Sequence, residues 1–90
     1  MSTAYISNDF KEFCFAIKIS YPEKIVELRN KKNPLIKEME ELTNQKEYLS
    51  RYDLKMNRHR RIEIDDLIGQ LDNDIEFYDE ILKRVNEILN

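Results

Sequence analysis

The feature that most constrains the fold of this chain is a run of apolar residues spaced alternately four and three positions apart. The run comprises Ile64, Ile68, Leu71, Ile75, Tyr78, Leu82, Val85 and Leu89. This spacing places all of them on one side of an α-helix and is typical of a coiled-coil seam. Leu67, Ile81 and Ile88 widen that side beyond a two-stranded seam. The wide apolar side predicts a helical bundle, built by one chain or by several.

A second seven-residue series precedes this run and differs from it in phase. It comprises Leu35, Leu42, Leu49 and Met56, with Met39 at the alternate position and Lys46 and Asp53 as interruptions. A further step of seven from Met56 reaches Glu63, whereas the later run begins at Ile64. Because one residue rotates a helix by about 100°, an unbroken helix would turn one seam away from its partner. We therefore predict that the chain turns between the two series.

The predicted turn lies at 57–61, within the segment Lys55–Arg61. Basic residues before and within this segment favour a helix C-terminus, and the acidic residues that follow favour an N-terminus. Since the segment has no glycine, Asn57 is expected to adopt the left-handed conformation that ends the first helix. The prediction is an antiparallel hairpin of helices 34–56 and 61–89, with one long rod as the alternative.

The N-terminal segment predicts an arm and a short helix. Residues 1–8 have no helical period and are predicted to form the arm. A helix over 9–19 is expected to begin at Asn8 or Asp9, both good N-cap residue types. Its apolar stripe comprises Phe10, Phe13, Cys14 and Ile17.

Two prolines divide the next part of the chain. The sequence Ser20-Tyr21-Pro22-Glu23 is typical of a helix start, because serine can cap the helix and proline is tolerated in its first turn. It predicts a helix over 21–32. Pro34 is predicted either to kink this helix or to restart it as the segment 34–56.

Composition agrees with an all-α fold and with a single small domain over 1–90. One Gly and two Pro among 90 residues provide too little turn chemistry for the hairpins of a sheet. The single cysteine, Cys14, excludes an internal disulfide and suits a reducing cytoplasm. Neither a secretory leader nor a membrane-spanning stretch is recognisable. We therefore expect a cytoplasmic protein that does not use a membrane.

The predicted apolar surface exceeds what one hairpin can cover. Helix 61–89 carries two neighbouring apolar stripes, while Phe10, Phe13 and Phe15 load the short N-terminal helix with aromatic rings. Two long helices share only one interface, so a monomer would leave a large apolar patch in water. We therefore expect a homo-oligomer.

Charge is segregated along a chain whose net charge is −3. Residues 51–61 hold five basic side chains and one acidic one, whereas 63–90 hold nine acidic and two basic ones. Arg58, Arg60 and Arg61 could capture phosphate, because guanidinium groups match phosphate oxygens. The alternative is a solvated turn that complements the helix dipole. No helix has a continuous basic stripe, so long duplex nucleic acid is not an expected partner.

No residue pattern indicates catalysis, and no cofactor or metal is predicted. The chain lacks a Gly-rich phosphate loop and a histidine pair, and its only histidine, His59, falls in the predicted turn. Two acidic pairs, each one helical turn apart, are Glu38 with Glu41 and Glu63 with Asp66. These pairs resemble the paired acids of all-α nucleoside triphosphate pyrophosphatases, which bind Mg²⁺ through oxygen ligands. The other interpretation is that they are solvent-facing acids of amphipathic helices.

The segment Tyr21–Lys31, Tyr-Pro-Glu-Lys-Ile-Val-Glu-Leu-Arg-Asn-Lys, resembles the opening of the first long helix in phage anti-CBASS sponge proteins. Those proteins are short helical chains that form hexamers, with a small N-terminal helix followed by an antiparallel hairpin. They sequester cyclic di- and trinucleotide second messengers without cleaving them. The resemblance implies a phage protein that acts in the host cytoplasm and binds a small anionic nucleotide.

The resemblance also implies a binding site around Lys24, which corresponds to the phosphate-contacting lysine of the family. An aromatic ring from Phe10, Phe13 or Tyr21 would then stack on a base. A cation and an aromatic plate form the minimal receptor for a ligand with phosphates and π faces. The alternatives are a solvated Lys24 in the first helical turn and a Tyr21 that packs as a hydrophobic staple. The predicted ligand-binding set is Lys24, Tyr21, Phe10, Phe13, Arg29, Arg58, Arg60 and Arg61.

Three functions follow from these observations. The first is a non-enzymatic, oligomeric hairpin protein that sequesters cyclic nucleotides. The second is a coiled-coil protein that inhibits or bridges a protein partner. The third is a Mg²⁺-dependent pyrophosphatase that uses the two acidic pairs.

Overall fold

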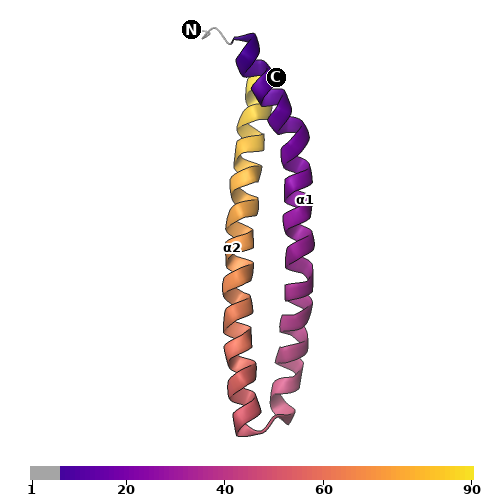
Figure 1. Cartoon of the computed structure of the whole chain (residues 1–90), viewed down its shortest axis with the longest axis vertical. Coiled ribbons are helices and arrows are strands. Elements are labelled where there is room, and N and C mark those ends of the chain that lie inside the picture. Colours follow the sequence, from indigo (N-terminus) through magenta and orange to yellow (C-terminus); the bar gives the residue numbers. More distant parts are fainter. Residues whose placement is uncertain (1–6) are drawn as a thin grey trace.

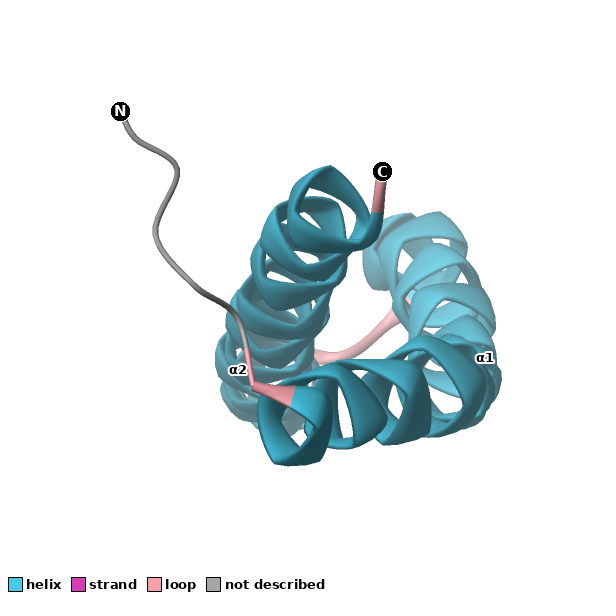
Figure 2. Ribbon diagram, turned by 90° about the horizontal axis from the view of Figure 1, so that it is seen from above, coloured by secondary structure: helices cyan, strands magenta, loops and turns pink. Residues whose placement is uncertain are grey.

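The computed structural model describes residues 7–90 and shows an all-α helical hairpin (Figure 1). Helix α1 spans Asn8–Gln45, the short 3-10 helix η1 spans Lys46–Tyr48, and helix α2 spans Arg51–Leu89. The two long helices run antiparallel, and the first turns of α1 cross the last turns of α2 (Figures 1 and 2). The hairpin measures 66 × 22 × 16 Å. The all-α hairpin predicted from the heptad series is thus confirmed.

Helix α1 begins earlier than predicted. Its N-cap is Ser7, whose hydroxyl accepts a hydrogen bond from the backbone N–H of Phe10 at 3.1 Å. The prediction that the helix begins with Asn8 or Asp9 as its N-cap is therefore wrong. Ser7 stands three residues before the N–H that it binds, which is the spacing that an N-cap side chain needs. The predicted arm is not present at Asn8, which is helical, and residues 1–6 lie outside the described part of the chain.

Helix α1 is continuous through both prolines, so the prediction of separate helices over 9–19, 21–32 and 34–56 is wrong. Pro22 and Pro34 are both exposed. The carbonyl groups that lose their N–H donors at these positions can therefore bond to water. Buried residues of α1 lie both before and after Pro22. Packing of this stripe against α2 favours one continuous helix over a restart.

The turn between the long helices lies at 46–50, so the prediction of a turn at 57–61 is wrong. Ser50 caps α2: its Oγ accepts a hydrogen bond from the backbone N of Asp53 at 3.2 Å and donates to the Asp53 carboxylate at 2.9 Å. A serine followed three residues later by an acidic residue is typical of the start of a helix. This local pair starts α2 well before the predicted position.

Asn57 is a buried residue of the helix interface, and the prediction that it takes a left-handed conformation is wrong. No non-glycine residue of the described range has a positive φ, and Asn57 is 5% exposed. It stands seven residues before Ile64 and so extends the later apolar run by one heptad. The two heptad series differ in phase because they lie on different helices: Leu35 and Leu42 belong to α1, whereas Met56 is an exposed residue of α2.

The two helices meet along one interface in a regular register. Tyr21 lies edge-on to Tyr78 with ring centroids 4.8 Å apart, and the side chain of Asn57 bonds to the Leu42 carbonyl. Three heptads forward along α1, from Tyr21 to Leu42, therefore match three heptads backward along α2, from Tyr78 to Asn57. Two buried clusters line this interface, one of Cys14, Ile17 and Val85 and one of Ile25, Leu28 and Ile75.

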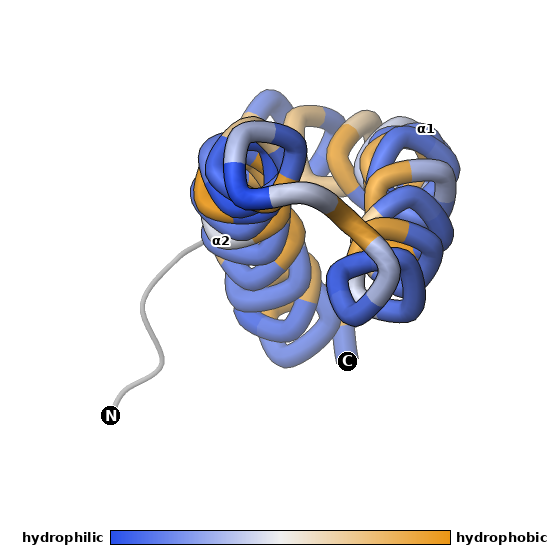
Figure 3. Tube along the Cα trace, turned by 90° about the horizontal axis from the view of Figure 1, so that it is seen from below, coloured by the Kyte–Doolittle hydropathy of each residue, from blue (hydrophilic) through white to orange (hydrophobic). Residues whose placement is uncertain are grey.

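The hairpin is a single layer of two helices and covers only part of its apolar surface. Seven apolar residues of the described range are buried, whereas fourteen large apolar side chains are exposed. Hydrophobic segments recur along both helices (Figure 3). The exposed apolar side chains therefore outnumber the core. Within the described residues, neither helix has a stretch long and apolar enough to cross a bilayer.

Candidate functional site

One open side of the hairpin gathers most of the predicted aromatic and lysine ligands. Phe10, Ile17 and Lys24 are seven residues apart and so form one row on α1. Ile81 of α2 packs against the buried cluster that contains Ile17. The row on α1 therefore runs beside the side of α2 that carries Ile81. We call this surface the Lys24 face, formed by Phe10, Phe13, Ile17, Lys24, Phe77, Ile81 and Arg84.

The Lys24 face presents aromatic rings to solvent. Phe10 and Phe13 are exposed, with ring centroids 6.5 Å apart. Phe77 is also exposed and makes an edge contact with Tyr78, with centroids 5.6 Å apart. Tyr21 differs, because its ring is partly buried in the helix interface against Tyr78. Three phenyl rings therefore remain available for stacking, and Tyr21 serves the interface.

Phe77 is the exposed ring at the level of Lys24. Tyr21 faces Tyr78, so Lys24 is level with Ile75, and Phe77 lies two residues, or about 3 Å, further along the axis. Phe10 lies fourteen residues before Lys24, which is about 21 Å along the helix. Along the hairpin axis, Phe77 is therefore much nearer to Lys24 than Phe10 is.

The cations of the Lys24 face are only loosely paired. Lys24 Nζ lies 3.8 Å from Glu27 Oε2, and both side chains are about half exposed. Arg84 Nε lies 3.4 Å from Glu80 Oε1 on a largely exposed pair. Exposed ion pairs contribute about 0–1 kcal/mol. Lys24 and Arg84 can therefore exchange these partners for an anion at little cost.

A hollow of about 540 Å³ lies along α2 beside Phe77. Its lining residues are Asn73, Glu76, Phe77, Glu80, Ile81 and Arg84. The volume falls within the range of about 300–1,000 Å³ that is usual for small-ligand sites. All six residues belong to α2; the arginine favours an anion there, whereas the two glutamates disfavour one. Sequence reasoning missed Phe77 and Arg84, although their four-and-three spacing with Ile81 is a signal that they share a face.

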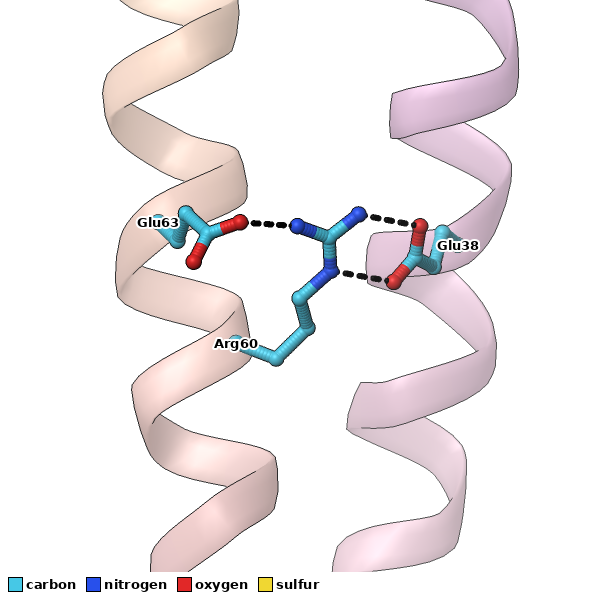
Figure 4. Close-up of polar contacts among 3 residues, drawn as sticks. All are labelled: Glu38, Arg60 and Glu63. Carbon is cyan, nitrogen blue, oxygen red and sulfur yellow. Dashed lines mark hydrogen bonds and ion pairs between the residues drawn. The ribbon is translucent and has the colours of Figure 1, made fainter.

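Arg60 forms a clamp between the helices near the turn (Figure 4). Its Nε and Nη2 donate to the two carboxylate oxygens of Glu38 at 2.7 and 3.0 Å, and its Nη1 donates to Glu63. These hydrogen bonds lower the pKa of the Glu38 carboxyl and raise the pKa of Arg60 further above its ordinary value. A bidentate pair also fixes the relative position of its partners. Arg60 therefore already occupies the space between Glu38 and Glu63, which belong to the two acidic pairs of the pyrophosphatase interpretation.

The other acids of that interpretation lie apart from the clamp. Glu41 is exposed on α1, and Asp66 accepts a hydrogen bond from Gln70 Nε2 at 3.1 Å. Among residues 7–90, no group of three or more His, Cys, Asp or Glu side chains is arranged to hold a metal ion.

Arg61 supports the buried amide of Asn57. Its Nε donates to Asn57 Oδ1 at 2.7 Å, while Asn57 Nδ2 donates to the Leu42 carbonyl at 2.9 Å. Leu42 lies in the last turn of α1, where backbone carbonyls lose their helical donors. The predicted ligand residue Arg61 thus takes part in closing the hairpin.

Arg58 and Arg29 lie away from the Lys24 face. Arg58 is exposed and, together with Lys55, His59 and Ile62, lines a hollow of about 310 Å³ on α2. Arg29 is exposed five residues after Lys24, a spacing that puts it on another side of α1. The basic side chains around Arg58 therefore remain exposed, as the predicted capture of phosphate requires.

The predicted ligand residues thus form two separate groups. Because Asn57 faces Leu42, the arginines of 58–61 lie beside residues 38–42 of α1. That level is at least fourteen residues from Lys24, or about 21 Å at 1.5 Å per residue. One hairpin therefore does not bring the arginines of the turn to the Lys24 face.

Comparison of the chain with protein-family models, with curated proteins and with solved structures gives no match. The function is therefore inferred from the Lys24 face and from the exposed apolar surface.

Proposed function

We propose that this chain is a non-catalytic binding protein that acts as a homo-oligomer and takes a small anionic nucleotide, such as a cyclic di- or trinucleotide, at the Lys24 face. The observation that carries the proposal is the exposure of phenyl rings on the face that also carries a loosely paired lysine. The resemblance of Tyr21–Lys31 to phage sponge proteins supports the ligand class. Such a protein would sequester a host second messenger in the cytoplasm.

The chemistry of the Lys24 face fits this ligand. The ammonium group of Lys24 would contact a phosphate, and the exposed ring of Phe77 would stack on a base. Base stacking on an aromatic ring contributes about 1–3 kcal/mol per base. The exposed rings of Phe10 and Phe13, too distant from Lys24 within one hairpin, would reach a ligand bound by another copy. Self-association of the hairpin and nucleotide binding are therefore linked in this proposal.

Thermal denaturation with a panel of cyclic di- and trinucleotides tests the proposal. A ligand in hundredfold excess over its Kd stabilises the folded state by about 2.7 kcal/mol. Lys24→Ala and Phe77→Ala should each remove this stabilisation while leaving far-UV circular dichroism unchanged. Lys37→Ala is the matched control, because Lys37 is an exposed lysine of the same helix on another side. The proposal fails if no cyclic nucleotide stabilises the protein, or if Lys24→Ala binds as tightly as the wild type.

The second candidate is a coiled-coil protein that inhibits or bridges a protein partner. It is supported by the fourteen exposed large apolar side chains, which a helical partner could cover. This function predicts no stabilisation by nucleotides. It also predicts that binding of the partner is insensitive to Lys24→Ala and sensitive to removal of exposed apolar residues.

A further inference from the structure

A second series with alternating spacing of four and three runs along the outward side of α1. It comprises Phe15, Ile19, Pro22, Val26, Arg29, Asn33 and Ile36. Its large apolar members are exposed in the hairpin: Phe15 by 50%, Ile19 by 71%, Val26 by 55% and Ile36 by 37%. This spacing forms a coiled-coil seam. We call these seven residues the outer stripe, and one hairpin offers it no partner.

Helix α2 carries an acidic row along one edge of the helix interface, where Asp72 pairs with Lys32 of α1. Asp65, Asp72 and Asp79 are seven residues apart and all are exposed, so they form an acidic row on that helix. The outer stripe of α1, in contrast, contains one charged residue, Arg29. Charge therefore favours a further helix against the outer stripe of α1 rather than against the acidic row of α2.

We propose that the outer stripe binds the outer stripe of a second copy, antiparallel, around a two-fold axis beside Val26. The proposal rests on the self-association in the proposed function and names its interface. The other members of the series stand three or four, seven, and ten or eleven residues from Val26 on its two sides. An antiparallel copy that places Val26 against the partner's Val26 therefore opposes the other members to within one residue. Phe15 then meets the partner's Ile36 at each end. This self-complementarity is what a two-fold interface requires.

Charge also fits this arrangement. Glu23 and Arg29 stand three residues on either side of Val26, so each meets its opposite charge on the second copy. Beyond each end of the stripe, Glu12 would lie opposite the partner's Glu40. Because these two like charges repel each other, the contact between the copies is limited to the segment between them. Four helices result, with the two α1 helices in the centre and the acidic α2 helices outside.

The arrangement leaves the Lys24 face open. Lys24 precedes Val26 by two residues, and two residues rotate the helix by about 200°. Lys24 therefore lies on the side of α1 opposite to the two-fold contact. Dimerisation and nucleotide binding are thus compatible and can be measured separately.

Sedimentation equilibrium of variants tests the interface. The wild type should form a dimer, or a multiple of dimers, and Val26→Glu should weaken the two-fold association at least about 100-fold with unchanged helix content. Ile62→Glu is the matched control, because Ile62 is an equally exposed apolar residue of α2 (59%), and it should keep the wild-type assembly. A monomeric wild type overturns the proposal, as does a Val26→Glu variant that assembles normally.

Two further variants test the orientation. Glu23→Arg should weaken the dimer, and the double variant Glu23→Arg with Arg29→Glu should restore it. Val26→Cys should form a disulfide-linked dimer on mild oxidation, without competition from Cys14, which is 1% exposed. Failure of both the restoration and the cross-link overturns the antiparallel geometry. Absence of nucleotide binding in an intact Val26-centred dimer would instead refute the proposed ligand and leave the interface standing.

Discussion

Replacement of Asn57 by alanine should lower the free energy of unfolding by about 2–3 kcal/mol. The Asn57 side chain is 5% exposed, donates to the Leu42 carbonyl at 2.9 Å and accepts from Arg61 at 2.7 Å. A neutral hydrogen bond contributes about 1 kcal/mol and one to a charged group about 1.5–3 kcal/mol. Because Arg61 is partly exposed, water replaces part of its contribution. The expected loss in the free energy of unfolding is therefore smaller than the sum of the two hydrogen-bond contributions.

Asn57→Leu should behave differently from Asn57→Ala. Leucine completes the apolar seam that begins at Ile64, so this variant should be more stable than the alanine variant. A buried polar residue at a seam position is a known means of fixing register. The leucine variant should therefore retain helix content and lose some of the uniqueness of its assembly, visible as mixed species in sedimentation.

Urea denaturation at fixed protein concentration, followed by far-UV circular dichroism, measures both changes. For a domain of this size, 2 kcal/mol corresponds to a fall in Tm of about 8–16 °C. Asn73→Ala is the control, since Asn73 is an exposed asparagine of the same helix, and it should change stability by at most about 0.5 kcal/mol. The reasoning is refuted if Asn57→Ala matches this control or if leucine is as destabilising as alanine.

Three other predictions concern the core, the turn and the clamp. Ile64→Ala removes a side chain with 0% exposure and should cost about 2–5 kcal/mol in the same urea titration. Ser50→Ala removes the cap of α2 and should cost about 1 kcal/mol; an unchanged midpoint would contradict the capping role. The pKa of Glu38 is lowered in the folded state by its hydrogen bonds with Arg60, so the pair stabilises the fold above the ordinary glutamate pKa of about 4.3 and loses this effect as pH falls through the folded value. Glu38→Gln should therefore be less stable than the wild type at pH 7 and equal to it in strong acid, and a difference independent of pH would argue against the clamp.

The position of the turn shows where pattern reasoning fails. The basic residues around Arg58 and the phase difference after Met56 both pointed to 57–61, but the chain reverses at 46–50. Capping depends on one hydroxyl at the right backbone position, and Ser50 with Asp53 supplies it. A local hydrogen bond thus outweighed a longer-range charge trend, because dipole effects are screened at exposed helix ends.

The candidate site was predictable in part. Lys24, Phe10 and Phe13 were recognised in the sequence, and their row on α1 follows from helical spacing. Phe77 was missed because its closeness to Lys24 depends on how the two helices are aligned, which the spacing within either helix leaves open. Tyr21 was assigned to a ligand, yet its ring packs against Tyr78.

By itself, the sequence determined that the chain is helical, that its helices are amphipathic and that they pair as an antiparallel hairpin. Spacing of apolar residues is a property of each helix alone, so it can be read along the chain, as in the run from Ile64 to Leu89. Only the tertiary structure decided the register, because register depends on contacts between residues distant in sequence. The amide of Asn57 on the Leu42 carbonyl and the guanidinium of Arg60 on Glu38 fix that register. These polar contacts have directional geometry that apolar periodicity does not encode.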